Sequence, residues 1–481
     1  MKAALQRKWE SIGRHALPVL SAAPSGGRAT YDRLLQAIGD APVVMIGEAS
    51  HGTLDFYRER AIITRRLIEE KGFSSVIVEA DWPDAYRINR FVQHYPTTKD
   101  KTAQDALGDF ERFPKWMWRN TVEFVEWMRE YNANRDVRQR AGFYGMDLYS
   151  FIASSNEVLE YLEKVDPQLA EDARENYECF LQYGDDPHAY ARHTAFGMSP
   201  TCEKEVLETL KMIRAKTHER MRRDGFLEHD EDFYAQQNAE IVKDAEEYYR
   251  ASAIGRADSW NIRDSHMVKA IHDLIGHRTK QTGAPAKVVI WAHNSHLGDA
   301  RATDMGRKRR KHNVGQLLRE QCGFNNTFNI GFTTYTGTVS AASGWGKPLQ
   351  KKNVVPGRKD SWEGVLHEAR PNGWHDFMLI FNQVKKASDS EARLGQWSHV
   401  LQGALRKHEV DTELTRLLSD ELLERYIGVI YRPDTELLSH YSSSALSLQY
   451  DAVIHIDQTE ALPPIDPHPH FPSSSSSSSY A

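Results

Sequence analysis

The 481-residue sequence predicts an α/β fold in which a central, mostly parallel sheet is flanked by helices. Short apolar runs bounded by Gly, Asp or Asn recur along the chain, as expected for buried strands. Longer amphipathic segments separate several of these runs, and such alternation is typical of α/β proteins. A third observation is a strand-free interval rich in Glu, Ala, Lys and Arg, which predicts a helical lobe inserted between the third and fourth strands.

Eight apolar runs are predicted to be strands. In chain order they are VVMIG from Val43, SSVIVE from Ser74, GFYGMD from Gly142, KVVIWA from Lys287, FNIGF from Phe328, DFMLIF from Asp376, IGVIY from Ile427 and AVIHI from Ala452. The segment YRERAIITRRLIEEKG follows the first run and places four apolar residues at roughly helical spacing, namely Ala61, Ile62, Leu67 and Ile68. Gly72 ends this pattern, so the segment is predicted to be a helix.

The domain organisation follows from these segments. We expect one catalytic domain over residues 1–464, with the helical lobe at about residues 150–282 as an insertion. Residues 465–481 are rich in Pro, His and Ser and cannot bury enough apolar surface to fold. They are therefore predicted to be a disordered tail.

Composition and charge limit the class of protein. With 40% hydrophobic residues, 27% charged residues and a formal net charge of -6, the chain gives no sign of a nucleic-acid binder, so a small-molecule partner is expected. No apolar run approaches the roughly 18 residues that cross a bilayer, and the first residues lack the apolar core of a secretion signal, so a cytoplasmic protein is expected. Cys179, Cys202 and Cys322 lie far apart without CxxC spacing, so we expect reduced thiols.

Polar residues follow four of the predicted strands. Glu48 follows the first strand, Glu79 ends the second, and Asp147 follows the third. His293 and His296 follow the fourth strand in the sequence WAHNSHLG. Side chains from the carboxyl ends of parallel strands converge in the crevice where open α/β sheets bind ligands. These residues are therefore the candidates for a functional site.

The first turn, GEASHG, suits hydrolysis by activated water. A serine nucleophile would need a G-x-S-x-G elbow, but Gly47 lies three residues before Ser50 rather than two, and no cysteine lies beside a candidate base. An imidazole such as that of His51, oriented by Glu48 or Glu79, can take a proton from water as the water attacks a carbonyl. Arg60, about two helical turns further on, or a histidine of the second pair could stabilise the oxyanion.

Several alternatives remain open from the residues alone. Glu48 could simply stabilise a helix N-terminus, His51 could be a surface imidazole, and Asp147 could cap the segment that follows it. The spacings from Glu48 to His51 and from His293 to His296 could also supply the ligands of a metal-dependent hydrolase. Finally, the same site could hold a ligand such as haem or a macrocycle without turning it over.

Seven ordered motifs resemble those of the erythromycin esterase family, from about Pro42 to Pro464. They are IGEASHGT, VEADWP, FYGMD, WNIRDSHM, WAHNSHLG, NVGQLLRE and ERYIGVIYRPDTELLSHY. By this resemblance His51 matches the family's catalytic histidine, Glu48 its acidic partner and Glu79 its second carboxylate. The family's arginine matches Arg60, and its later histidine pair matches His293 and His296.

The resemblance also implies what the protein does. A two-lobed α/β fold is expected, with the active site in a cleft between the lobes. The implied activity is carboxylic ester hydrolysis, for which a macrolactone such as a macrolide antibiotic would be the substrate, as in antibiotic resistance. The implied chemistry uses activated water without a covalent intermediate, a metal or another cofactor. Asp147, which follows the third predicted strand, is expected from that position rather than from the resemblance to contact the substrate.

Overall fold

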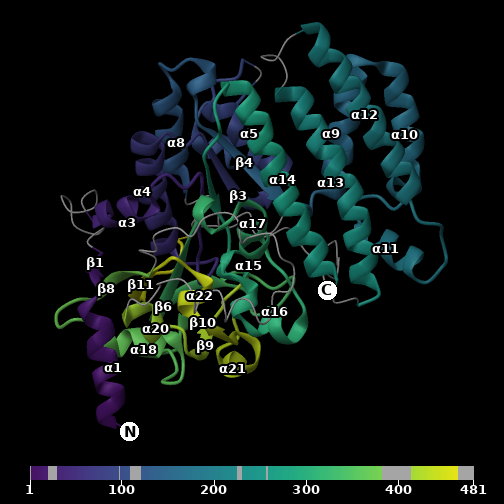
Figure 1. Cartoon of the computed structure of the whole chain (residues 1–481). Coiled ribbons are helices and arrows are strands. Elements are labelled where there is room, and N and C mark those ends of the chain that lie inside the picture. The colour runs from purple at the N-terminus through teal and green to yellow at the C-terminus, as the bar shows by residue number, and fades with distance from the viewer. Residues whose placement is uncertain are drawn as a thin grey trace. The chain divides into compact units, whose positions relative to one another are not determined.

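Figure 1 shows the chain as a computed structural model. The structure describes residues 2–19, 30–96, 98–108, 121–224, 230–255, 258–381 and 413–463. These residues fall into two compact units. Unit 2 is Ser74–Val288, and unit 1 comprises the chain up to Phe73 and again from Val289. The predicted tail at 465–481 lies outside the described residues.

Unit 1 contains most of the strands. Its strands are β1 (Leu17–Pro18), β2 (Val43–Ile46), β5 (Val288–Trp291), β6 (Thr327–Ala341), β7 (Gln350–Val354), β8 (Asp376–Ile380), β9 (Glu421–Arg425), β10 (Tyr441–Ala445) and β11 (Ala452–Thr459). Its helices are α1 (Lys2–Arg14), α3 (Asp32–Ile38), α4 (Leu54–Lys71), α15 (Asn294–Leu297), α16 (Asp304–Arg309), α17 (Val314–Cys322), α18 (Trp362–Ala369), α20 (Glu413–Leu417), α21 (Glu436–Ser439) and α22 (Leu446–Gln449).

The sheet of unit 1 places β2 and β5 side by side. Its strand order is β1-β8-β11-β6-β2-β5, with β7 paired to β6, while β9 and β10 form a separate two-stranded sheet. β2 and β11 both run parallel to β6, on its two sides. Every residue of β2 and of β5 is buried, which explains why both read as continuous apolar runs. Glu48 and His51 follow β2, and His293 and His296 follow β5, so these four candidate residues come after neighbouring strands.

Unit 2 combines a strand pair with a series of helices. β3 (Ser75–Asp81) runs parallel to β4 (Gly142–Asp147), and the register shifts between Val78 and Asp81. The helices around them are α5 (Trp82–Val92), α6 (Ala103–Ala106) and α8 (Val122–Asn132). After β4, the described residues form helices without an intervening strand: α9 (Phe151–Val165), α10 (Pro167–Leu181), α11 (Pro187–Ala195), α12 (Glu203–Asp224), α13 (Asp230–Ala253) and α14 (Ser259–Thr282).

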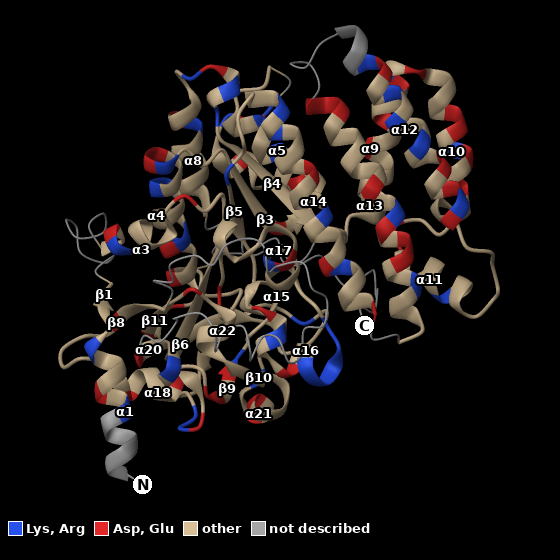
Figure 2. Ribbon diagram, viewed as in Figure 1, with Lys and Arg blue, Asp and Glu red and all other residues tan. Residues whose placement is uncertain are grey.

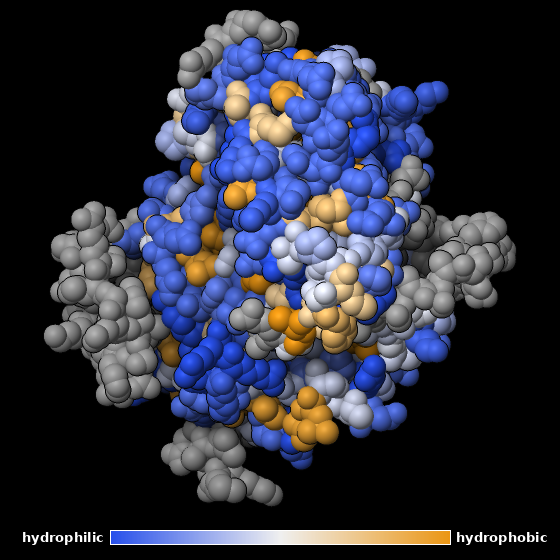
Figure 3. Space-filling view, turned by 90° about the vertical axis from the view of Figure 1, so that its right-hand side faces the viewer, coloured by the Kyte–Doolittle hydropathy of each residue, from blue (hydrophilic) through white to orange (hydrophobic). Residues whose placement is uncertain are grey.

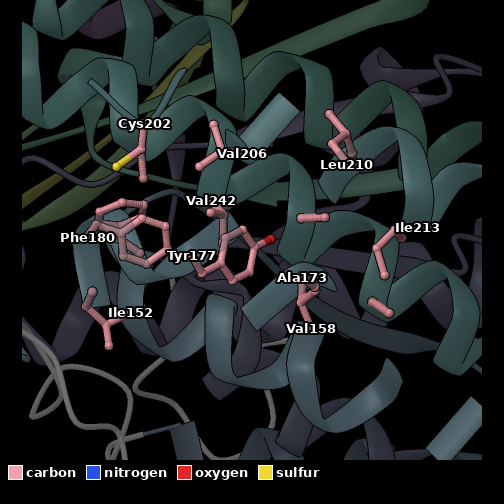
Figure 4. Close-up of a cluster of buried hydrophobic side chains, with 14 of the residues drawn as sticks. Ile152, Val158, Ala173, Tyr177, Phe180, Cys202, Val206, Leu210, Ile213 and Val242 are labelled. Atoms are coloured by element: carbon pink, nitrogen blue, oxygen red, sulfur yellow. The ribbon is translucent and has the colours of Figure 1, made fainter. Parts of the chain in front are cut away.

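The helices α9, α10, α12 and α13 share a hydrophobic core. Figure 4 shows side chains of all four helices packed together, including Val158, Tyr177, Leu210 and Val242. These four side chains are at most 2% exposed. Each helix therefore buries one apolar face against the others, which is the arrangement that amphipathic helices favour.

Cys179 and Cys202 form a disulfide, with their Cα atoms 6.0 Å apart. Cys202 belongs to the buried core and is labelled in Figure 4, and Cys179 packs against this core. The prediction that all the cysteines are reduced is therefore wrong for this pair, while Cys322 is a free thiol. The two residues are separated by 23 positions and form no spacing motif. They meet because α10 packs against the start of α12, which the cysteine spacing does not reveal.

The outer faces of these helices carry charges of both signs (Figure 2). Several of them pair, such as Lys211 with Glu208 on α12 at 2.6 Å and Arg174 with Glu163 at 2.5 Å. The face drawn in Figure 3 is mostly hydrophilic, with apolar residues in small patches. Among the described residues, no helix combines the length and apolar character needed to cross a membrane.

The predicted fold class is confirmed, with a mostly parallel central sheet flanked by helices. Seven of the eight predicted strands are present, and the exception is the run from Ile427. Ile427 and Ile430 make only isolated bridges, to Ser50 and Ala342, and the regular strand nearby is β9. This run is apolar because Ile427 packs in a small buried cluster with residues of β6 and β7, rather than because it forms a ladder.

Candidate active site

The turn after β2 places Glu48 at the carboxyl end of this strand. The backbone N–H of Gly47 extends the pairing with β6 by donating to the Ile330 carbonyl at 2.8 Å. A Cβ at position 47 would lie only 2.1 Å from Oδ1 of Asn294, so glycine is required here. The backbone N–H of Asn294 in turn donates to the Glu48 carbonyl at 2.8 Å. The start of α15 is thereby fixed directly against Glu48.

Glu48 connects a histidine and an arginine. Its Oε1 accepts a hydrogen bond from Nδ1 of His51 at 2.9 Å, and its Oε2 accepts one from Nη2 of Arg60 at 2.7 Å. Glu48 is 2% exposed and Arg60 is fully buried, whereas the His51 side chain is 12% exposed. The two oxygens of Glu48 thus face two different donors. The carboxylate can therefore accept from both neighbours at once.

Arg60 lies beneath the turn, between aromatic rings. Its guanidinium carbon is 4.3 Å from the ring centroid of Tyr57 and 5.1 Å from that of Trp291. Cation–π contacts of this kind stabilise a desolvated guanidinium. The Arg60 side chain is fully buried, and its guanidinium donates a hydrogen bond to Glu48.

The second histidine pair begins directly after β5. His293 caps α15, and its ring centroid lies 4.8 Å from that of His51. His296 is a residue of α15 itself and is 3% exposed. The structure thus brings His293, together with Glu48, His51 and Arg60, into one group, which we call the Glu48 cluster.

The hydrogen bonds at the two Nδ1 atoms set opposite tautomers. Nδ1 of His51 faces an acceptor-only carboxylate, so it carries the proton, and the lone pair of the neutral ring lies on Nε2. Nδ1 of His293 accepts from the backbone N–H of Ser295 at 3.3 Å and contacts its Oγ at 2.8 Å. The proton of neutral His293 therefore lies on Nε2. The two facing rings, in their neutral forms, therefore carry their protons on opposite nitrogens.

Nε2 of His51 makes no hydrogen bond within the described part of the chain. The turn that carries this ring is held by its backbone, because the N–H of His51 donates to the Ile427 carbonyl at 3.3 Å. In addition, the Gly52 carbonyl accepts from the N–H of Ser340 at 3.0 Å. His51 is thus a fixed imidazole with one nitrogen available for a proton.

Glu79 and Asp147 lie in unit 2, where one arginine joins them. Arg263, on α14, donates through Nε and Nη2 to the two oxygens of Asp147 at 2.9 and 2.6 Å. The same Nη2 donates to Oε1 of Glu79 at 2.9 Å. The guanidinium also lies 4.7 Å from the ring centroid of Tyr149. We call these four residues the Arg263 cluster.

Electrostatics stabilise the charged form of Arg263. Burial opposes its charge, but the carboxylates of Asp147 and Glu79 raise the pKa of Arg263 well above its ordinary value. The pairing of β3 with β4 is irregular between Val78 and Asp81, so Glu79 lies within this irregular stretch. Arg263 bridges the two carboxylates, and the side chains of Glu79 and Asp147 are at most 8% exposed.

Sequence reasoning missed Arg263 and Tyr426. Arg263 lies within the motif WNIRDSHM, and Tyr426 within ERYIGVIYRPDTELLSHY, so both stood in recognised motifs. Neither residue follows a predicted strand directly, so the rule that polar residues at strand ends form the site does not include them. Arg263 is also 184 positions from Glu79, so the sequence does not indicate their contact. The ring of Tyr426 lies 6.2 Å from that of His293. Motif membership, rather than strand position, was the signal that could have found them.

Comparison with known proteins identifies relatives of the chain. A family model described as erythromycin esterase matches residues 68–459. Glu79, Asp147, His293 and His296 fall within this range, whereas the turn after β2 precedes it. Erythromycin esterase type II of Escherichia coli is 27% identical over 125 residues, which are 26% of this chain and only 28% of that protein. The putative hydrolase YbfO of Bacillus subtilis (strain 168) is 23% identical over 445 residues, or 89% of this chain and 91% of that protein.

Solved structures share the fold over nearly the whole chain. A succinoglycan biosynthesis protein superimposes with a TM-score of 0.69 at 19% identity, covering 95% of this chain and 98% of that one. A Bacillus cereus protein gives 0.70 at 17% identity, with 96% and 99% covered. A mutant of erythromycin esterase EreC in its open conformation gives 0.64 at 15% identity, with 94% and 99% covered. At these identities the likeness establishes the fold.

Proposed function

Because the chain belongs to the erythromycin esterase family, we propose that it hydrolyses a carboxylic ester or macrolactone with water activated by His51. Family membership supports a hydrolase. The observation that carries the finer proposal is the hydrogen bond from Nδ1 of His51 to Glu48 at 2.9 Å, which leaves Nε2 as the basic nitrogen. Arg60 supports this base indirectly, because its hydrogen bond to Oε2 of Glu48 at 2.7 Å holds the carboxylate that orients His51.

The proposed reaction balances without a covalent enzyme intermediate. Nε2 of His51 takes a proton from water while the water oxygen attacks the ester carbonyl carbon. The resulting oxyanion accepts a hydrogen bond from Nε2–H of His293, which costs no reorganisation because that tautomer already exists. Collapse of the tetrahedral intermediate breaks the bond to the alcohol oxygen, and that oxygen receives the proton from His51. The products are an acid and an alcohol, so one water is consumed.

Ser50 is a poor candidate for an alternative nucleophile. Its side chain is 1% exposed, and its hydroxyl is hydrogen-bonded to that of Thr53. No imidazole nitrogen is paired with this hydroxyl among the described residues. An acyl-enzyme on Ser50 would need a base within hydrogen-bond reach. This arrangement supports direct attack by water.

We further propose that the Arg263 cluster takes part in the reaction, with Asp147 contacting the substrate and Glu79 acting as the second carboxylate. Arg263 supports both roles, because it holds the two carboxylates at fixed distances. His296 is proposed as a further member of the catalytic group through its place on α15. The family resemblance supports the assignments of Glu79 and His296, and the position of Asp147 at the carboxyl end of β4 supports its assignment.

The metal-dependent alternative is less well supported by the geometry. Both oxygens of Glu48 are already engaged, by His51 and by a buried arginine whose positive charge opposes a second cation. Within the described ranges, no group of three or more His, Cys, Asp or Glu side chains is arranged to hold a metal ion. A protonic base at His51 needs only the hydrogen bonds that are present.

Mass spectrometry with defined esters tests the proposal. The purified chain is incubated with erythromycin A, other macrolactones and p-nitrophenyl acetate, and products are examined for the gain of one water. We expect hydrolysis that survives prolonged chelation and desalting, without an acyl adduct in the intact protein mass. Loss of activity that zinc or manganese restores would favour the metal-dependent alternative. An absorption band of bound haem without turnover of any ester would favour a binding protein.

A further inference from the structure

Glu424, the fourth residue of β9, is a buried carboxylate that collects four side-chain donors. Its Oε2 accepts from Oγ of Ser444 at 2.6 Å, from the hydroxyl of Tyr426 at 2.7 Å and from Nε2 of Gln449. Its Oε1 accepts from the hydroxyl of Tyr450 at 3.1 Å. The Glu424 side chain is 0% exposed. We call these five residues the Glu424 hub, because hydrogen bonds to a carboxylate are strong and hold the donors together.

Three members of the hub lie against α15. At the start of this helix, the ring of Tyr426 lies 6.2 Å from that of His293, at an angle of 57°. At its end, a Cβ on Gly298 would lie 2.5 Å from Oε1 of Gln449 and 2.7 Å from the hydroxyl of Tyr450. Side chains bonded to one carboxylate therefore contact α15 at both ends.

External contacts must set the position of α15, because four residues are too few to form a stable helix by themselves. The backbone beside the hub also holds the turn that carries His51. The N–H of Ile427 donates to the Ala49 carbonyl at 2.9 Å, and the Ile427 carbonyl accepts from the N–H of His51. The short segment from Glu424 to Ile427 thus contacts the supports of both facing histidines.

We propose that Glu424 is a positioning residue, which fixes α15 through Tyr426, Gln449 and Tyr450 and thereby orients His293 toward His51. This inference rests on the proposed function, in which Nε2–H of His293 stabilises the oxyanion. Glu424 itself does not touch the reacting atoms, since its hub partners lie between it and α15. A displacement of about 1 Å in a catalytic group costs on the order of 100-fold in rate, so loosening one of the three hub members that lie against α15 is expected to slow turnover. Ser444 bonds to Glu424 but is not one of these three members, so its loss is expected to leave the rate unchanged.

Tyr426→Phe is the first test, with Ser444→Ala as its matched control. Each change removes one hydroxyl bonded to Glu424, but only Tyr426 contacts His293. We expect kcat for p-nitrophenyl acetate to fall about 10-fold in Tyr426→Phe, with KM within about threefold of the wild type. The melting temperatures of both variants should fall by similar amounts, but Ser444→Ala should keep a wild-type kcat. Equal effects of the two changes on kcat would overturn the proposal.

A second readout does not depend on turnover. The Cε1–Hε1 resonance of His293 is assigned by its loss in His293→Gln and followed by NMR in protein without substrate. We expect Tyr426→Phe and Glu424→Gln to shift this resonance and its titration, while Ser444→Ala leaves both unchanged. An unchanged resonance in Tyr426→Phe would overturn the positioning role. If the wild type hydrolysed no ester, the proposed function would fail, and this readout would still decide whether Glu424 orients His293.

If Glu424→Gln fails to fold, Gly298→Ala tests the contact between the hub and α15 instead. Gly298→Ala leaves every hydrogen-bonding group of the hub in place but pushes its new Cβ into Gln449 and Tyr450. We expect this variant to shift the His293 resonance in the same way as Tyr426→Phe. A folded Gly298→Ala protein with a wild-type His293 resonance would contradict the contact between the hub and α15.

Discussion

At the scale of single residues, the partners of two imidazoles decide what each ring can do. His51 faces a carboxylate and His293 faces a backbone N–H, so in their neutral forms these two rings, 4.8 Å apart, carry their protons on opposite nitrogens. The carboxylate that sets the first tautomer depends in turn on a buried arginine. The position of the His51 ring is thus tied, through Glu48, to a fully buried guanidinium.

Substitution of Arg60 should therefore cost both stability and activity. In Arg60→Gln, Glu48 would remain buried without its charged partner, and breaking such a pair costs about 3–5 kcal/mol. We expect the free energy of unfolding, measured by urea denaturation, to fall by about 3 kcal/mol, and hydrolysis to fall with it. Arg65→Gln, an exposed position on the same helix, should change it by less than about 1 kcal/mol. Equal stability of the two variants would show that Arg60 does not hold Glu48.

At the scale of elements, buried strands could be predicted from the sequence, and contacts between distant elements could not. β2, β3, β4 and β5 read as apolar runs because they are buried, and the polar residues after them were found for the same reason. Short strands such as β9 and β10 lack this pattern, because some of their buried positions are occupied by polar residues such as Glu424 and Ser444. Arg263 was missed because its partners come from other elements.

Asp376, the first residue of β8, is expected to make the stability of the fold depend on pH. Burial and the nearby carboxylates of Asp55 and Glu59 raise the pKa of Asp376 from 3.8 to about 6. The folded state then binds a proton more tightly than the unfolded state, so stability falls as pH rises from about 4 to 6 and stays lower above that range. Asp376→Asn removes the charge and keeps the oxygen that accepts from the backbone N–H of Asp457.

We expect Asp376→Asn to raise the free energy of unfolding at pH 8 by roughly 1–2 kcal/mol, with the gain shrinking toward pH 5. Urea denaturation at several pH values measures this difference. The exposed carboxylate of Asp434 provides the control, since Asp434→Asn should change stability by less than about 0.5 kcal/mol at either pH. A gain from Asp376→Asn that did not depend on pH would show that its carboxyl does not titrate in this range.

At the scale of the whole molecule, the candidate residues divide between the two units. Unit 1 holds the Glu48 cluster and the Glu424 hub. Unit 2 holds the Arg263 cluster and the hydrophobic core of its helices, which contains the disulfide cysteine Cys202. The fold of unit 1 therefore holds the Glu48 cluster together, and the fold of unit 2 holds the Arg263 cluster together. Changes that loosen one unit should leave the chemistry of the other unit's cluster intact.

Reduction of the disulfide should act on unit 2 alone. Linking Cys179 to Cys202 closes a loop of 23 positions, which stabilises the fold by about 3 kcal/mol in the chain-entropy account. For a unit of this size that corresponds to about 6–12 °C in the unfolding temperature, measured by calorimetry with and without a phosphine reductant. Cys202→Ser should reproduce the effect of the reductant, and Cys322→Ser should not. A transition that ignored the reductant would mean that the bond contributes nothing to unit 2.

The most direct test of the central claim is the turnover of a His51→Ala protein that remains folded. His51 lies on a turn and is partly exposed, so the change leaves no large core cavity and should cost little stability. If Nε2 of His51 is the base, kcat should fall by roughly 10² to 10⁴-fold, and Glu48→Gln added to it should cost little more, because the two act as one unit. Circular dichroism checks folding, and mass spectrometry follows the gain of one water by the ester. A folded His51→Ala protein that hydrolyses its ester at the wild-type rate would contradict the account.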